Sequence, residues 1–151
     1  MTFQELGLHS DLLKAVTELG FQQATPIQQQ TIPLLANQRT DLVALAQTGT
    51  GKTAAFGLPL LQAIDTNDRT VQALILAPTR ELCVQITNDI RNYGKYLKGF
   101  SITAVYGGAR IDGQIKDIKK GVQIVAATPG RLIDMIERRV INLNLVKFVV
   151  L

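Results

Sequence analysis

The segment from Ala46 to Thr53 reads AQTGTGKT and combines residue types that bind phosphate groups. Gly49 and Gly51 let the backbone turn so that successive N–H groups can face an anion. Lys52 can then reach the β and γ phosphates of a nucleotide, and the Thr53 hydroxyl can hold Mg²⁺, which prefers oxygen ligands. We therefore predict a nucleoside triphosphate site formed by Gln47, Thr48, Gly49, Thr50, Gly51, Lys52 and Thr53, with Lys52 and Thr53 serving catalysis.

The neighbours of this segment favour a phosphate-binding loop. A continuous apolar run at residues 42–46 precedes it and predicts a strand buried on both faces, and a helical stretch follows it. The pattern G-x-x-x-x-G-K-[ST] requires such a strand and helix, and Ala46 is the one departure, because the pattern has glycine there. The alternative is an accidental glycine-rich turn, which would explain neither neighbour.

Apolar runs and amphipathic stretches alternate along the rest of the chain. Further buried strands are predicted at residues 73–77, 102–106, 123–127 and 148–151. The clearest helix between them has apolar residues at spacings of three and four, namely Leu82, Ile86, Ile90, Tyr93 and Leu97. This alternation predicts an α/β fold with a parallel sheet of about five strands, helices on both faces and ligands at the carboxyl ends of the strands.

Two helices are expected before the loop. Ser10 can cap the first helix, and Thr25 can cap the second, which has Pro26 at its first position where a missing N–H costs nothing.

Composition narrows the class of protein. The 151 residues, 46% of them hydrophobic, suffice for one domain, and the formal net charge of +4 favours a polyanionic partner. Cys83 is interpreted as a packed helix residue, and with the single histidine, His9, it forms no metal-ligand cluster. No apolar run approaches the roughly 20 residues of a membrane span, and the amino terminus lacks the pattern of a signal peptide. A cytoplasmic protein without membrane association is expected.

Several further motifs lie at fixed positions around AQTGTGKT. They are GFQQATPIQ at residues 20–28, PTREL at 78–82, the Gly107–Gly108 pair and TPGR at 128–131, with an isolated aromatic, Phe3, at the start. Together they resemble the DEAD-box RNA helicases, bacterial members in particular, over essentially the whole chain. The resemblance implies a RecA-like P-loop NTPase domain, with residues 1–36 as the Q-motif region and N-terminal helices and residues 37–151 as the first helicase domain, the two forming one domain.

The resemblance also implies how ATP would be recognised. In this family the aromatic of the first motif stacks on adenine and the glutamine amide reads the edge of the base, which implies these roles for Phe21 and Gln28, with Thr25 beside them. An amide can donate and accept together, as adenine N6 and N7 require. The alternative for Phe21 is a hydrophobic staple that packs its loop onto the second helix.

The later motifs are implied to bind the backbone of single-stranded or short duplex RNA without reading its sequence. Each follows a predicted buried strand, where a parallel sheet binds ligands, and helix N-termini, glycine amides and arginine forks all suit phosphate. The residues implied are Pro78, Thr79, Arg80, Gly107, Gly108, Thr128, Pro129, Gly130 and Arg131. Taken singly, each motif could instead serve only as a helix cap or a turn.

The chain ends at FVVL, where the family continues with Asp-Glu-Ala-Asp. By resemblance those acids hold Mg²⁺, and a second domain completes the site, so an incomplete domain with negligible ATP hydrolysis is expected from this chain and an ATP-dependent RNA helicase from the intact protein. The resemblance also implies ribosomal or RNA-decay partners for that protein. The alternatives are a small-molecule kinase with a P-loop and a non-catalytic module that binds nucleotide or RNA.

Overall fold

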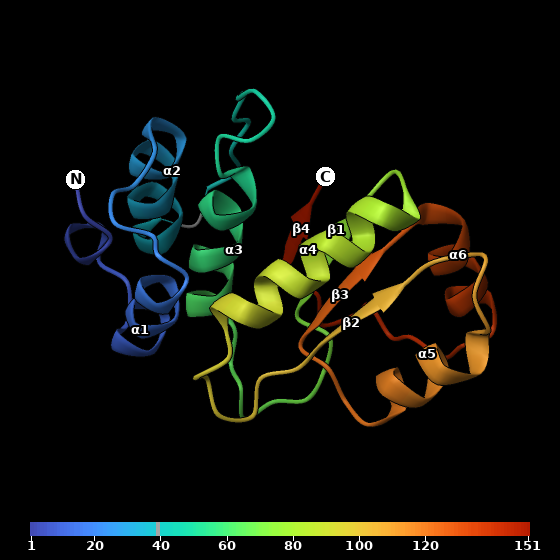
Figure 1. Ribbon diagram of the computed structural model, residues 1–151. Helices are drawn as coiled ribbons and strands as arrows, with labels where there is room; N and C mark the ends of the chain where they lie inside the picture. Colours follow the sequence, from blue (N-terminus) through green and yellow to red (C-terminus); the bar gives the residue numbers. More distant parts are fainter. Residues whose placement is uncertain (39) are drawn as a thin grey trace. The chain divides into compact units, whose positions relative to one another are not determined.

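The computed structural model describes residues 1–38 and 40–151, and the chain divides into two compact units. The first unit holds residues 1–63 and 92–98, and the second holds residues 64–91 and 99–151. Figure 1 labels the α-helices and the strands of both units. No helix that the structure describes combines the length and the apolar character needed to cross a membrane.

The first unit is helical. It contains a short 3₁₀ helix η1 (Gln4–Leu6) and the helices α1 (Ser10–Glu18), α2 (Pro26–Asn37) and α3 (Lys52–Ala63). The predicted start of α2 is confirmed, with Thr25 in the capping position and Pro26 in the first turn. For α1 the capping position is His9 instead of Ser10, and the His9 N–H donates to Gln62 Oε1 at 2.9 Å. The fully buried side chains that form this core are Leu6, Leu12, Val16, Ile32, Leu58 and Leu61.

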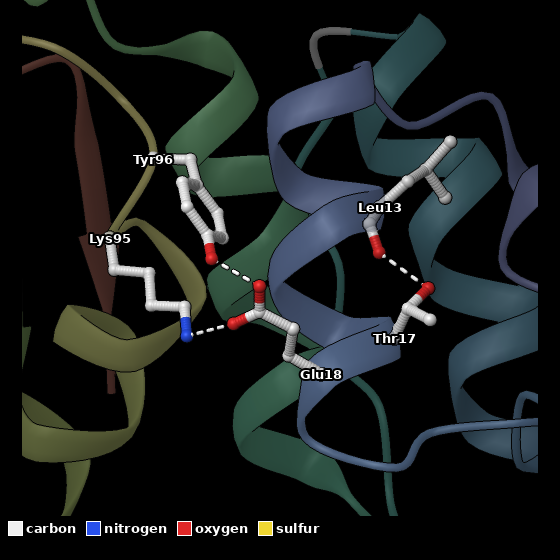
Figure 2. Close-up of polar contacts among 5 residues, drawn as sticks. All are labelled: Leu13, Thr17, Glu18, Lys95 and Tyr96. Atoms are coloured by element: carbon white, nitrogen blue, oxygen red, sulfur yellow. Dashed lines mark hydrogen bonds and ion pairs between the residues drawn. The ribbon is translucent and has the colours of Figure 1, made fainter.

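Residues 92–98, which belong to the first unit, contact α1. Lys95 donates a hydrogen bond to one carboxylate oxygen of Glu18, and the Tyr96 hydroxyl donates to the other (Figure 2). The Lys14 ammonium lies 4.1 Å from the centre of the Tyr96 ring. The hydrogen bond from Lys95, with that from Tyr96, lowers the pKa of the Glu18 carboxyl. The Glu18 carboxylate and the Lys14 ammonium thus both join α1 to this segment.

The second unit is a parallel sheet with helices. In chain order it contains β1 (Ala73–Leu76), α4 (Arg80–Tyr93, of which the last two residues belong to the first unit), β2 (Ile102–Val105), α5 (Ile111–Lys119), β3 (Ile124–Ala127), α6 (Pro129–Glu137) and β4 (Phe148–Val150). The strands lie in the order β2-β3-β1-β4, and every neighbouring pair is parallel. Each of the four strands occupies a run predicted from the sequence.

Helices cover both faces of this sheet. Val125 and Ala127 of β3 pack in one core cluster with Ile118 of α5 and with Leu132 and Met135 of α6. The opposite face meets α4, whose buried Cys83 thiol donates to the Ala126 carbonyl of β3 at 3.2 Å. The predicted α/β class, with a parallel sheet between two helical layers, is confirmed.

The strand predicted at residues 42–46 is wrong. These residues form no strand, and Val43 and Leu45 are 89% and 92% exposed. A strand needs a neighbour that pairs with its N–H and C=O groups, and no described strand pairs with this segment. An apolar run indicates that a segment favours burial, but it does not show whether a neighbouring strand is present to pair with it.

The helix predicted around Leu82 needs two corrections. The buried face of α4 carries Cys83, Ile86 and Ile90, while Leu82 is 38% exposed. The helix also ends at Tyr93, before Leu97, because Gly94 follows and the Leu97 N–H turns back to the Gly94 carbonyl at 2.9 Å.

Candidate functional site

The loop at residues 46–53 leads into α3, which begins at Lys52 as the motif predicts. Gly49 and Gly51 have φ values of 79° and 83°, in the left-handed region that glycine adopts without strain. Within the described chain, the backbone N–H groups of residues 48 to 54 donate to no other residue, whereas the Ala55 N–H already donates to the Gly51 carbonyl at 3.1 Å. The loop and the first turn of α3 therefore offer a continuous run of unpaired donors.

Within the part of the chain that the structure describes, the polar side chains of the loop hydrogen bond only to the loop itself. Lys52 is exposed, and its Nζ donates to the Ala46 carbonyl at 2.9 Å. The Thr50 hydroxyl donates to the Gln47 carbonyl at 2.7 Å. Thr53, in the first turn of α3, is partly exposed, as a metal ligand at this position would have to be. To pair with the Lys52 ammonium, an incoming anion would have to replace the hydrogen bond from Nζ to the Ala46 carbonyl.

Gln28 and Thr25 tie α2 to the loop. The Gln28 side chain is 3% exposed, its Nε2 donates to the Gly51 carbonyl at 3.1 Å, and its Oε1 accepts the Thr25 N–H at 3.0 Å. The Thr25 hydroxyl donates to the Thr50 carbonyl at 2.8 Å. The two residues thus fix the backbone on the side of the loop where α3 begins.

Phe21 lies partly buried in an aromatic cluster. Its ring centre is 5.9 Å from that of Phe3 and 6.1 Å from that of Tyr93, both in tilted arrangements. These contacts favour a packing role like that of the staple, and they leave part of the ring exposed.

The motifs of the second unit meet at the carboxyl ends of their strands. Arg80 begins α4 after β1, and its guanidinium lies 4.9 Å from the centre of the Tyr106 ring, which follows β2. A Cβ placed on Gly108 would lie 3.6 Å from an Arg80 nitrogen. Arg131, which follows β3, donates to the Ala109 carbonyl at 3.0 Å. Three segments far apart in sequence therefore form one surface, as their shared position after buried strands predicts.

Most of this surface is open to solvent. Pro78, Thr79 and Arg80 are exposed, and the Thr79 hydroxyl accepts the Leu82 N–H at 3.2 Å, as a helix cap does. Gly107, Gly108, Pro129 and Gly130 are also exposed, and Thr128 and Arg131 are partly buried. Gly108 has a φ of 78°, so the turn needs glycine there. Exposed amides beside two guanidinium groups suit a phosphate backbone.

Comparison with known proteins agrees with these motifs. The family model of the DEAD/DEAH box helicases matches residues 25–151. The chain belongs to this family. It is 50% identical over 151 residues to the DEAD-box ATP-dependent RNA helicase CshA of Streptococcus pneumoniae, covering all of this chain and 28% of that relative. It is 48% identical over 151 residues to the ATP-dependent RNA helicase DeaD of Haemophilus influenzae, covering 24% of it.

Solved structures of DEAD box proteins share the fold of this helicase-family chain. A DEAD box protein from Methanococcus jannaschii superposes with a TM-score of 0.91 at 42% identity, covering 99% of this chain and 40% of that one. The S. cerevisiae protein Dbp5 bound to RNA and ADP BeF3 gives 0.87 at 32% identity, covering 99% and 37%. The chain thus spans less than half the length of each.

The motifs of the sequence do not include two further residues at the carboxyl ends of the strands, Tyr106 and Gln114. Tyr106 precedes the Gly107–Gly108 pair and stacks with Arg80. Gln114 lies on α5 among Ile111, Ile115 and Ile118, yet it is only 8% exposed. A single glutamine on an otherwise apolar helix face is the sequence feature from which Gln114 could have been predicted.

No group of three or more histidine, cysteine or acidic side chains that could hold a metal ion lies in the part of the chain that the structure describes. The Cys83 thiol is fully buried and burial raises its pKa, which confirms its interpretation as a packed residue.

Proposed function

We propose that residues 47–53 bind the phosphates of ATP, and that a protein which contains this sequence and extends over the length of its relatives is an ATP-dependent RNA helicase. The observation that carries the nucleotide part is the run of backbone N–H groups from residue 48 to residue 54 that donate to no other described residue. An anion with several oxygens satisfies such a run at once, and the positive end of the α3 dipole adds to the attraction.

Lys52 and Thr53 would act at the reacting end of the nucleotide. The Lys52 ammonium leaves the Ala46 carbonyl and neutralises charge on the β and γ phosphates. The Thr53 hydroxyl offers Mg²⁺ the hard oxygen that this ion prefers, and the bound ion would neutralise charge on the phosphates during transfer. The remaining residues of the proposed phosphate site are Gln47, Thr48, Gly49, Thr50 and Gly51.

Phe21, Thr25 and Gln28 would form the adenine side of the site. Gln28 already uses one amide hydrogen on Gly51 and one oxygen lone pair on Thr25, which leaves one hydrogen and one lone pair for the base edge. Because the same amide donates to the Gly51 carbonyl, binding of the base to Gln28 would be coupled directly to the backbone of the phosphate loop.

The surface on the second unit would hold the backbone of single-stranded or short duplex RNA. Its donors are guanidinium groups, hydroxyls and glycine amides, which contact phosphate without reading base identity. The residues proposed are Pro78, Thr79, Arg80, Gly107, Gly108, Thr128, Pro129, Gly130 and Arg131. That the relatives CshA and DeaD are named ATP-dependent RNA helicases, and that Dbp5 was solved with RNA and ADP BeF3, supports this assignment.

The full-length protein would separate short RNA duplexes at the expense of ATP. We place it in the cytoplasm, which the single cysteine supports, since one cysteine forms no intramolecular disulfide. Partners in ribosome assembly or RNA decay are proposed for the full-length protein on the family assignment alone.

The first test measures ATP hydrolysis by the full-length protein with and without single-stranded RNA. We expect hydrolysis that rises with RNA, together with separation of a short duplex. We expect negligible turnover by the 151-residue chain, which spans 28% of the relative CshA. Tight RNA binding by the full-length protein without RNA-stimulated hydrolysis would favour a non-catalytic module. Transfer of phosphate to a small molecule would favour a kinase.

The second test measures competition between ATP and GTP for the 151-residue chain. Phe21→Ala and Gln28→Ala should each reduce the preference for ATP, because each removes a group assigned to the adenine. Gln30→Ala is the matched control, since Gln30 is exposed on α2. Equal competition by both nucleotides in the parent chain would refute these two roles.

A further inference from the structure

Gln114 of α5 is a buried polar side chain whose hydrogen bonds all go to the segments proposed to bind RNA. A buried amide is costly unless it is paired. The Gln114 Nε2 donates to the Tyr106 carbonyl at 3.1 Å, and its Oε1 accepts the Tyr106 N–H at 3.3 Å. The same oxygen accepts a guanidinium hydrogen of Arg131 at 3.1 Å. Because Arg131 can only donate, the orientation of the amide is fixed.

The two bonds to Tyr106 pair the amide with a backbone N–H and C=O as a neighbouring strand would. Tyr106 is the residue directly before Gly107, so this pairing fixes the point where the Gly107–Gly108 turn leaves β2. Arg131 holds the other end of the turn through the Ala109 carbonyl at 3.0 Å. Within the described chain, the N–H groups of Gly107 and Gly108 donate to no residue, so the turn is fixed at both ends with its donors open.

Gln114 also reaches Arg80 through Tyr106. The Arg80 guanidinium lies over the Tyr106 ring and beside Gly108. The buried amide of Gln114 therefore contacts two of the three segments directly, at Tyr106 and at Arg131. It supports the third segment, at Arg80, indirectly through the Tyr106 ring.

We propose that Gln114 is the positioning residue of the RNA surface, which holds the glycine turn and Arg131 in the arrangement that receives a phosphate backbone. It contacts no RNA itself. The inference rests on the proposed function, because it concerns the same surface. Its physical basis is preorganisation: a turn and an arginine that are already ordered lose less freedom when RNA binds.

The test measures the affinity of the 151-residue chain for a single-stranded polyuridine oligonucleotide and, in parallel, for a non-hydrolysable ATP analogue. Gln114→Leu keeps the approximate size and removes every hydrogen bond, and we expect RNA affinity to fall by about tenfold or more, as for loss of a charged hydrogen bond. Nucleotide affinity should not change, whereas general unfolding would lower both. Gln85→Leu, at an exposed position of α4, is the matched control.

Two further variants separate positioning from simple packing. Gln114→Glu keeps both acceptor contacts and gives Arg131 a charged partner, but its second carboxylate oxygen faces the Tyr106 carbonyl and repels it instead of donating. It should therefore retain more RNA affinity than Gln114→Leu and less than the parent, and it also serves if the leucine variant does not fold. In the Gln114→Leu background, Arg131→Ala should cost much less than it does in the parent, because the two act as a unit.

Failure of the proposed RNA surface and failure of the positioning role of Gln114 would give different results. Failure of the parent chain to bind RNA would overturn the proposed RNA surface and the role of Gln114 with it. RNA binding by the parent together with unchanged affinity of a folded Gln114→Leu chain, or fully additive losses with Arg131→Ala, would overturn the positioning role alone. If the leucine variant does not fold, affinity of Gln114→Glu equal to that of the parent would overturn it.

Discussion

Replacing Lys52 by alanine is expected to lower the affinity of the chain for an ATP analogue by roughly 10- to 150-fold, the factor for losing a hydrogen bond from a charged group. Folding stability should change little, because Lys52 is exposed and its one hydrogen bond goes to the Ala46 carbonyl. Isothermal titration calorimetry measures the first quantity, and urea unfolding measures the second.

Two controls show whether the loss at Lys52 comes from phosphate. Lys98→Ala removes the same charge at another exposed position of the first unit and should leave affinity unchanged. Adenosine, which lacks phosphate, should bind the parent and the Lys52→Ala variant equally. A variant that retains the affinity of the parent for the ATP analogue would show that the loop assignment is wrong.

Gly51→Ala is expected to have the second large effect, on both stability and nucleotide binding. Its φ of 83° costs a residue with a Cβ about 1 to 2 kcal/mol. The new Cβ would also lie 2.2 Å from Nε2 of Gln28, which is buried and hydrogen bonded, so relief of the overlap adds roughly 1 to 3 kcal/mol. Urea unfolding should show the sum, and affinity for the ATP analogue should fall because the Gln28 contact with the loop is lost.

Gly49→Ala is the matched control for this overlap. Gly49 has nearly the same φ, 79°, but nothing lies within 4 Å of a Cβ at that position. It should therefore lose only the conformational part of the stability. Adding Gln28→Ala to Gly51→Ala should recover part of the loss, whereas equal destabilisation by Gly49→Ala and Gly51→Ala would contradict the contact.

The sequence predicts the sheet of the second unit well, because its strands pair with one another within the chain. The runs at residues 73–77, 102–106, 123–127 and 148–151 each contain a strand. The run at residues 42–46 is equally apolar and forms none, since strand formation depends on a partner that local pattern does not reveal. The helix after the loop and the left-handed glycines were predictable from the motif itself.

The contacts within the candidate site were less predictable, because they join residues far apart in the sequence. The motif places Gln28 near the base, but its contact with the Gly51 carbonyl is a property of the fold. Gln114 lies outside the motifs named above, and only the fold places its amide between Tyr106 and Arg131. Residue types predict which functional groups the site contains, and tertiary packing determines which other groups hold them in position.

A crystal structure of the chain with a non-hydrolysable ATP analogue tests the central claim most directly. We predict that phosphate oxygens accept hydrogen bonds from the backbone N–H groups of residues 48 to 53 and that Lys52 Nζ has moved from the Ala46 carbonyl to the β and γ phosphates. Phosphates bound elsewhere, with Lys52 still on Ala46, would contradict the account.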